Sequence, residues 1–381
     1  MKHSILYWDE TRYSSFPHVV KGENDELWVN FDWNAHTPLA RGPEGAAYSH
    51  GGASVGGKHG HVDLFSPDGG ESWFEDGKSN LYRECPEALR SAVLKDGSQI
   101  RISRPSDIIP AVRKEEFSKC GFVLRKLPGA RFSVENRLQM FRKRAASERW
   151  ESRYLNSGKE LPFFALIRTG TDLNSCILPD DTILHEVYGS VSAGDPFRAW
   201  VLRSEDAGDT WEMVEMAFDG GVHPFNEASL LHLKDGRIFA MVRTSSSSKS
   251  IPIEEKYLWQ THSSDQGKTW SPVQKTPMWG YPAQLLLLRN GDVLCSYGHR
   301  RSPYGIRACL SRDGCETWDI DHEIVLRADG LTTDGILSGK GVSPDLGYPK
   351  TVELNDGTLF TVYYFTLGDS VTHVAATKWS L

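Results

Sequence analysis

Ser263-Ser264-Asp265-Gln266-Gly267-Lys268-Thr269-Trp270 is one of four copies of a single eight-residue pattern in this chain. Written S-x-D-x-G-x-[ST]-W, the pattern also begins at Ser66, Ser204 and Ser311, and Cys315 replaces the glycine in the last copy. In such a turn the Asp carboxylate accepts hydrogen bonds from backbone N–H groups, and the glycine adopts a positive φ. The tryptophan anchors the returning strand in the core. Four copies therefore predict four hairpins of one kind.

A second repeat consists of apolar runs on both sides of a short turn rich in Asp, Asn and Gly. Asp-Gly and Asn-Gly between such runs are a strong signal for a β-hairpin. Turns of this kind occur at 24–25, 96–97, 180–181, 235–236, 290–291 and 356–357. They divide the 381 residues into six units of about 63 residues each. A four-stranded propeller blade needs roughly 40–45 residues, so each unit is long enough for one.

The two repeats interleave, so that each unit supplies one hairpin and then a second hairpin around the Asp turn. The last unit ends with the apolar run 372–379 and lacks a fourth strand, whereas Ile5-Leu6-Tyr7-Trp8 is a strand without a hairpin of its own. Pairing the two would close the ring and remove exposed strand edges. The sequence therefore predicts an all-β chain, a single domain over residues 1–381 folded as a six-bladed β-propeller, with the N-terminal strand closing the last blade.

One segment, residues 131–158, departs from this rhythm and is rich in Arg. Its spacing of basic and apolar residues predicts a helical or irregular insertion. A solvated decoration of a blade and a helix that binds a membrane or a partner are the two interpretations that the pattern leaves open.

The overall charge excludes some classes of protein. The chain has 43 Lys and Arg against 50 Asp and Glu, a net charge of −7, which argues against a nucleic-acid binder. No run approaches 18 apolar residues, so we expect no membrane span. Six scattered cysteines without a C-x-x-C pair predict neither a disulfide scaffold nor a structural zinc site.

The chain begins without an extended apolar region, which predicts a cytoplasmic protein, although a secreted protein lacking its leader would look the same. We expect no cofactor and no metal, and the oligomeric state stays open.

The candidate site comes from comparing like positions in the units. In a propeller the first strand of each blade lines the central channel, so its first residues face the pocket mouth. Eight residues before the turns at Asp235 and Asp356 stand Glu227 and Tyr348, and Arg243 follows Glu227 by sixteen residues. The other arginines at strand ends in this frame are Arg300 and Arg301. The pattern predicts a pocket with a carboxylate, a phenol and several guanidinium groups.

These features resemble the sialidase (neuraminidase) superfamily, in which the S-x-D-x-G-x-[ST]-W pattern is called the Asp-box, and the resemblance covers essentially the whole chain. It implies that Tyr348 is the nucleophile, Glu227 its base, and Arg243 with Arg301, or its neighbour Arg300, the clamp for the sugar carboxylate. A phenol is suited to this attack because the substrate's own carboxylate would repel a carboxylate nucleophile. Arg grips a carboxylate with two hydrogen bonds, which Lys does less well.

Two positions depart from the family pattern. The family's first Arg precedes a Pro by two residues, and Ser15 occupies that place. The family's acid/base Asp lies in the loop before the first Asp-box, where this chain has His50, His59 and His61 but no Asp before Asp63. We therefore expect one of these histidines to be the acid/base. The further candidates for substrate binding near this loop are His18 and Tyr48.

These residues favour an exo-acting glycoside hydrolase that releases a terminal acidic sugar, either sialic acid or a related keto-acid or uronic sugar. The first alternative is a lyase on uronic-acid-containing polysaccharides, in which Arg neutralises the uronate and His or Tyr moves the α-proton. The second is a propeller that binds carbohydrate without catalysis. The expected partner is an acidic carbohydrate in each case, with neither nucleic acid nor membrane.

Overall fold

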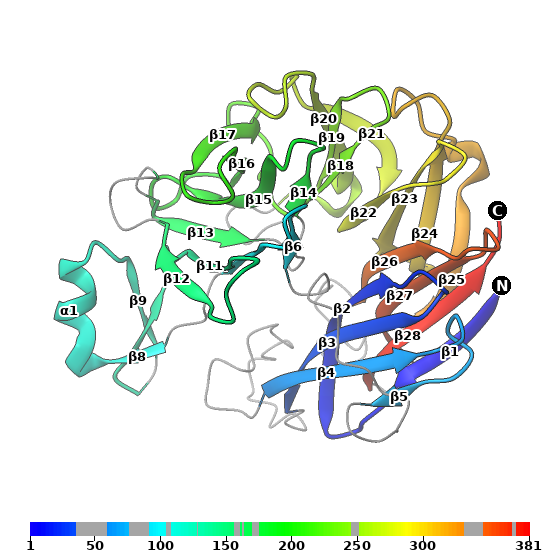
Figure 1. The fold of residues 1–381 in the computed structure, drawn as a ribbon, viewed down its shortest axis with the longest axis horizontal. Helices are drawn as coiled ribbons and strands as arrows, with labels where there is room; N and C mark the ends of the chain where they lie inside the picture. Colours follow the sequence, from blue (N-terminus) through cyan, green and yellow to red (C-terminus); the bar gives the residue numbers. More distant parts are fainter. Residues whose placement is uncertain are drawn as a thin grey trace. The chain divides into compact units, whose positions relative to one another are not determined.

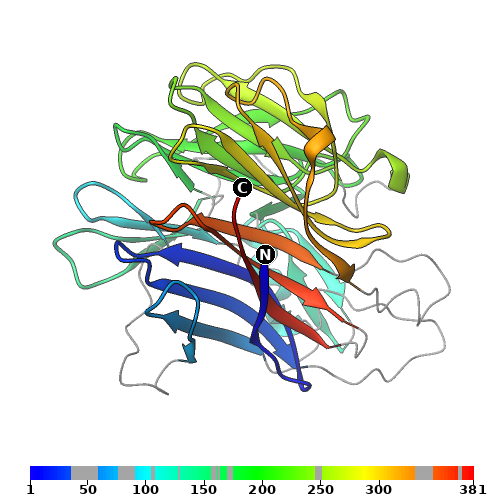
Figure 2. The same ribbon diagram turned by 90° about the vertical axis from the view of Figure 1, so that its right-hand side faces the viewer.

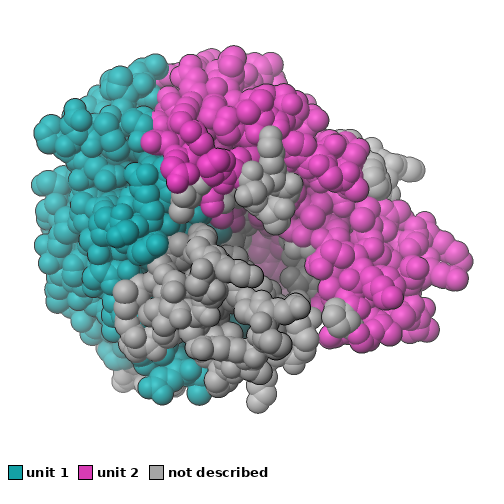
Figure 3. Space-filling model, turned by 180° about the vertical axis from the view of Figure 1, so that it is seen from behind, with its two compact units in different colours: residues 1–89, 277–381 teal, residues 90–276 magenta. Residues whose placement is uncertain are grey.

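The computed structural model describes residues 1–35, 59–75, 91–103, 108–127, 129–155, 161, 164–169, 175–244, 251–330, 346–367 and 371–381. Strands dominate throughout. The helical elements of these residues are α1 (Lys114–Lys119) and the short 3-10 turns η3 (Ala111–Arg113), η4 (Ile253–Glu255) and η5 (Ile320–His322). None of these described helices is long and apolar enough to cross a membrane. The chain divides into two compact units, residues 1–89 with 277–381 and residues 90–276, which Figure 3 shows in separate colours.

Unit 1, which is residues 1–89 with 277–381, contains three antiparallel four-stranded sheets among its described residues (Figure 1). The first comprises β2 (Arg12–Lys21), β3 (Leu27–Ala35), β4 (His59–Ser66) and β5 (Phe74–Glu75). The second comprises β22 (Ala283–Leu287), β23 (Val293–His299), β24 (Tyr304–Ser311) and β25 (Ile324–Gly330). The third comprises β26 (Gly347–Glu353), β27 (Leu359–Thr366), β28 (Thr372–Trp379) and β1 (Lys2–Tyr7).

Unit 2, residues 90–276, has three larger sheets and one small sheet in its described part. One sheet comprises β6 (Ala92–Val93), β7 (Gln99–Ser103), β11 (Gln139–Lys143) and β12 (Glu151–Tyr154). The next comprises β13 (Leu166–Thr169), β14 (Ser175–Ile177), β15 (Ile183–Ser190), β16 (Arg198–Ser204) and β17 (Glu212–Ala217). The last comprises β18 (Ala228–His232), β19 (Ile238–Val242), β20 (Tyr257–Ser263) and β21 (Gln274–Trp279). The small sheet comprises β8 (Ile108–Pro110), β9 (Leu124–Leu127) and β10 (Arg131–Val134).

The four Asp-box turns have the geometry that the sequence predicts. In each, the Asp accepts a hydrogen bond of 2.8 to 3.0 Å from the backbone N–H four residues later. The turn glycines adopt positive φ, and Cys315 takes the same conformation with φ 70°. All six predicted hairpin turns join strands that pair with each other. The hairpins are therefore confirmed, whereas ring closure, the number of blades and the single domain remain predictions.

The N-terminal strand also lies where the sequence predicts. β1 pairs antiparallel with β28, with Ile5 opposite Ala375, so the first and last strands of the chain are neighbours in one sheet (Figure 2). The core beside this sheet is formed by alternating residues: Leu27, Val29 and Phe31 of β3 are fully buried in one cluster with Phe360 and Val362 of β27.

The helical alternative for residues 131–158 is wrong where the structure describes them. Gln139–Lys143 and Glu151–Tyr154 are β11 and β12, paired with each other, and β11 also pairs with β7. The arginines serve the fold, since Arg142 contacts Asp209 at 2.5 Å and Arg153 donates to the carbonyls of Gly208 and Asp209. Their acceptors lie on the Asp-box turn of the next sheet. Basic residues there stabilise a turn of the same unit and do not form an amphipathic helix.

Candidate functional site

In each sheet that carries both, the candidate residues and the Asp-box lie at opposite ends. In the β18–β21 sheet, Ile238 opposite Ser263 marks the Asp-box end, and Ala228 opposite Val242 marks the other end, next to Glu227 and Arg243. In the β22–β25 sheet, Ser311 of the Asp-box lies opposite Val293. Arg300 and Arg301 follow β23 at the other end of the same sheet. In both sheets the candidate residues therefore lie at one end of the strands, and the Asp-box lies at the other end.

Tyr348 stands at an irregular start of β26. Its φ is 49°, and the pairing of β26 with β27 shifts between Gly347 and Lys350, as in a β-bulge. The side chain is buried, with its ring edge-to-face against Phe16 at 4.8 Å and stacked on Tyr364 at 5.8 Å. A positive φ costs a bulky residue about 1–3 kcal/mol and concentrates at functional sites. The surrounding rings hold Tyr348 in this conformation.

Of the two neighbouring arginines, Arg300 is the one that lies beside Tyr348. Arg300 is buried, its Nη2 donates to the hydroxyl of Tyr364 at 3.1 Å, and its Cζ lies 5.7 Å from the Tyr348 ring centroid. Arg301 is exposed and stacks over Trp279 at 4.2 Å. Both residues follow the end of β23, and their side chains contact different aromatic rings. Within unit 1 the phenol and a guanidinium therefore share one site.

Glu227 and Arg243 form an ion pair in unit 2. Their side chains are each 12% exposed. Backbone hydrogen bonds fix them, because the N–H of Arg243 donates to the carbonyl of Glu227 at 3.1 Å. The predicted spacing of sixteen residues thus places a carboxylate and a guanidinium side by side.

Tyr188 is a residue near this pair that the sequence comparison misses. Burial raises the pKa of its phenol, and the negative charges of Glu227 and Glu186 raise the pKa further, against an opposing effect of Arg243. Tyr188 is therefore a neutral phenol at ordinary pH, within electrostatic range of Glu227. It lies on β15, the second strand of its hairpin, and counting back from hairpin turns examines first strands only.

Of the three candidate histidines, His61 is the one whose side chain the structure describes. Nδ1 of His61 lies 2.6 Å from Oδ1 of Asp32, its partner across β3 and β4. His59 begins β4 opposite Asn34, and its side chain lies outside the described residues. His50 and Tyr48 fall in 36–58, also outside the described residues. Asp32 is a second residue that the sequence comparison misses, because the register across the long β3–β4 connection cannot be read from spacing.

His18 lies on β2 opposite Asn30, three residues beyond Ser15. Ser15 is fully buried, and its Oγ has no hydrogen-bond partner among the described residues. A serine supplies no positive charge, so the expectation that this chain lacks one clamp Arg stays a prediction. Across 59–75, 91–103 and the other described ranges, no group of three or more His, Cys, Asp or Glu side chains could hold a metal ion.

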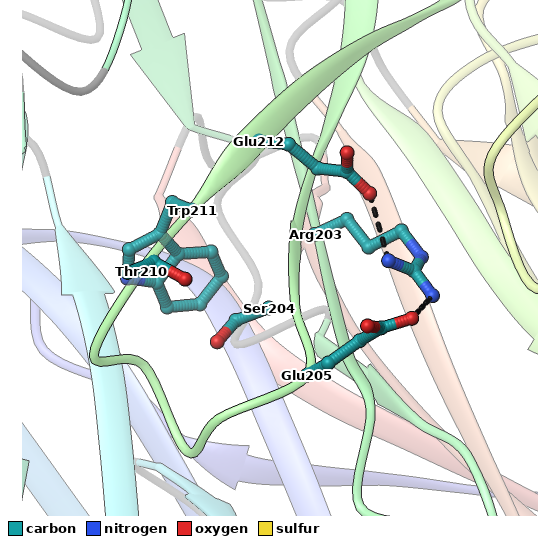
Figure 4. Close-up of a pocket in the computed structure, with 6 residues that line it drawn as sticks. All are labelled: Arg203, Ser204, Glu205, Thr210, Trp211 and Glu212. Carbon is teal, nitrogen blue, oxygen red and sulfur yellow. Dashed lines mark hydrogen bonds and ion pairs between the residues drawn. The ribbon is translucent and has the colours of Figure 1, made fainter.

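A pocket of about 210 Å³ opens at the Asp-box end of the β13–β17 sheet (Figure 4). Its guanidinium, Arg203, lies between two carboxylates, contacting Glu205 and donating to Glu212 at 2.7 Å. The two carboxylates already balance this cation, so the pocket does not suit an acidic sugar. The candidate residues of the β18–β21 and β22–β25 sheets lie at the end away from the Asp-box.

The family of the chain follows from comparison with known proteins. Residues 147–361 match the BNR repeat-like domain family, which is more than half of the chain, so the protein belongs to this family. The structural matches below show that it shares its fold with sialidases. No curated protein matches the chain.

Several solved structures share the fold. A protein of unknown function from Dyadobacter fermentans matches with a TM-score of 0.71 and 23% identity, over 100% of this chain and 98% of that one. The NanB sialidase from Streptococcus pneumoniae matches with a TM-score of 0.55 and 14% identity, over 99% and 70%. A leech intramolecular trans-sialidase matches with a TM-score of 0.57 and 12% identity, over 100% and 70%. The all-β, sialidase-like fold is thereby confirmed.

Proposed function

We propose that the protein is an exo-acting glycoside hydrolase that releases a terminal acidic sugar, with Tyr348 as the nucleophile. The observation that carries the proposal is the strained Tyr348 at the start of β26, with Arg300 beside its ring. A phenol and a guanidinium at one point suit a sugar whose anomeric carbon bears a carboxylate. The proposal includes the predicted ring of six blades.

The chemistry assigns a role to each group. Arg243, Arg300 and Arg301 are the candidates for binding the sugar carboxylate, with His18 and Tyr48 as further substrate contacts. The phenol oxygen of Tyr348 bonds to the anomeric carbon while Glu227 takes its proton, and the glycosidic oxygen leaves with a proton from His50, His59 or His61. Water then attacks the same carbon, the phenolate recovers its proton from Glu227, and the histidine regains its proton from the water. Glu227 and Tyr348 must act on one sugar for this sequence to run.

Turnover of aryl glycosides tests the proposal. The panel contains 4-nitrophenyl glycosides of sialic acid, glucuronic acid and galacturonic acid, with phenol release followed by absorbance. We expect one of them to be hydrolysed, and Tyr348→Phe to abolish that activity. Tyr304→Phe, a change on β24 outside the proposed machinery, is the matched control. Full activity of Tyr348→Phe would remove Tyr348 as nucleophile.

A lyase is the second candidate, because unit 1 alone holds Arg300, Tyr348 and the His61–Asp32 pair, which are the groups that an elimination needs. Elimination from a polyuronate gives an unsaturated product that absorbs in the near ultraviolet, whereas hydrolysis does not. Tight binding of an acidic sugar with no turnover of any kind would instead support a carbohydrate-binding propeller.

A further inference from the structure

We infer that His61 is the proton donor of the reaction and that Asp32 is its positioning residue. This inference rests on the proposed hydrolysis of an acidic glycoside and narrows it, because three histidines are otherwise eligible. Neither the sequence pattern nor the resemblance assigns a role to Asp32.

The first argument is the geometry of the pair. Nδ1 of His61 and Oδ1 of Asp32 are 2.6 Å apart, a short distance typical of a charge-assisted hydrogen bond. The side chains are 69% and 51% exposed, so a substrate can reach the imidazole. Asp32 occupies the Nδ1 side of the ring, and Nε2 is the nitrogen on the side away from it. An orienting carboxylate of this kind fixes the tautomer of a histidine and stabilises its protonated form.

The second argument is the position of the pair in unit 1. Asp32 lies opposite Ser15, and the pairing of β2 with β3 shifts between Ser15 and His18. Phe16, inside this bulge, has a φ of 57° and contacts the ring of Tyr348. Asp32 lies opposite Ser15, Ser15 precedes Phe16, and Phe16 contacts Tyr348. The His61–Asp32 pair is therefore linked to the proposed nucleophile through adjacent residues.

The third argument is the surrounding charge. The face of the β2–β5 sheet that carries His61 and Asp32 also carries Asp63, which accepts a hydrogen bond from Asn30 at 2.5 Å, and His18 opposite Asn30. Glu75 of β5 lies opposite Leu64, on the next strand. Asp63 is therefore an acidic residue on the same face as the His61–Asp32 pair, whereas Glu75 lies on the other face.

The proposed step is a single proton transfer. As the bond between the anomeric carbon and the glycosidic oxygen breaks, the proton on Nε2 of His61 passes to that oxygen, and the leaving group departs as an alcohol. Neutral His61 then takes a proton from the water that attacks the Tyr348-linked sugar. Asp32 keeps its charge throughout and holds Nδ1.

The test compares two leaving groups on the sugar that the wild-type protein hydrolyses. A 4-nitrophenolate leaves without protonation, whereas a galactose alcohol needs a proton. We expect His61→Ala to lower kcat/KM for the galactose-linked disaccharide by about 10²–10³-fold and for the 4-nitrophenyl glycoside by less than about fivefold. Asp32→Asn should show the same selectivity, with a loss of about tenfold on the disaccharide and an alkaline fall of kcat/KM that begins at lower pH.

The matched control is His322→Ala, which breaks another exposed pair, in which Nδ1 of His322 lies 2.7 Å from Oδ1 of Asp319. This variant should leave kcat/KM unchanged for both substrates. Equal losses on both substrates in His61→Ala, or none on either, would overturn the inference while leaving the hydrolase intact. Wild-type protein that cleaves neither glycoside would overturn the proposed function and the inference together. Unchanged thermal unfolding of the variants excludes misfolding as the cause.

Discussion

The rings of Phe16 and Tyr348 meet edge to face at 4.8 Å, and both residues hold a positive φ, 57° and 49°. Each lies in a bulge on an edge strand of a different sheet of unit 1, Phe16 on β2 and Tyr348 on β26. Two unfavourable backbone conformations therefore support each other through one aromatic contact, which is worth about 0.5–1.5 kcal/mol beyond the buried area. The contact determines where the phenol of Tyr348 lies.

Two substitutions of Phe16 distinguish the stability that its ring contacts provide from the strain of its backbone conformation. Phe16→Ala should destabilise the protein by about 2–3 kcal/mol, because the contacts with Tyr348 and Tyr364 are lost and the positive φ remains. Phe16→Gly should cost about 1 kcal/mol less, since glycine accepts this φ without strain. Urea unfolding measures both. A glycine variant less stable than the alanine variant would contradict strain at this position.

The two neighbouring arginines should differ in kinetics. Arg300→Ala is expected to lower kcat/KM for the acidic glycoside by more than about 100-fold, because a buried guanidinium beside Tyr348 is lost. Arg301→Ala should lower kcat/KM by less than about tenfold, since that side chain is exposed and stacks on Trp279, away from Tyr348. Steady-state kinetics of the two variants tests this prediction. A larger loss of kcat/KM in Arg301→Ala than in Arg300→Ala would indicate that Arg301 binds the sugar carboxylate.

The Asp-box of β20 should give the protein an acid-sensitive stability. Hydrogen bonds from the side chain and backbone of Thr269 lower the pKa of Asp265 to about 2. Since the folded-state pKa lies below the unfolded value, the contribution is present above about pH 4 and is lost as pH falls toward 2. Asp265→Ala should cost about 1 kcal/mol at pH 7, and the difference from wild type should vanish near pH 2. Denaturant titrations at several pH values measure this.

Lys350 should give a pH dependence of the opposite kind. Burial lowers the pKa of its amine to about 7, so the unfolded chain binds the proton more strongly between pH 7 and 10.5. Stability contributed by this group therefore rises with pH across that window. Lys350→Met should raise the free energy of unfolding at pH 7 by more than about 1 kcal/mol and flatten the rise. A variant with an unchanged profile would show that Lys350 is already neutralised by its surroundings.

The repeats predict much of the fold because turn chemistry is local. Asp265 and its equivalents need only the eight residues around them, and the β1–β28 pairing follows from one missing and one surplus strand. The β11–β12 hairpin is not predicted, since the acceptors of Arg142 and Arg153 lie more than fifty residues away. Glu227 can be predicted because its spacing from a nearby turn identifies it. Asp32 cannot, because its pairing with His61 depends on strand register across the long β3–β4 connection. Adjacent Arg300 and Arg301 can be told apart only once the contacts of each side chain are known.

The pairing of β1 with β28 has a consequence for synthesis on the ribosome. Unit 2 is one continuous segment and is complete once residue 276 has emerged. Unit 1 joins residues 1–89 to residues 277–381, so its sheet of β26, β27, β28 and β1 cannot form before residue 379 has emerged. Until then β1 has no strand to pair with, whereas β2 to β5 pair among themselves, so β1 is an unpaired strand that we expect a chaperone to protect.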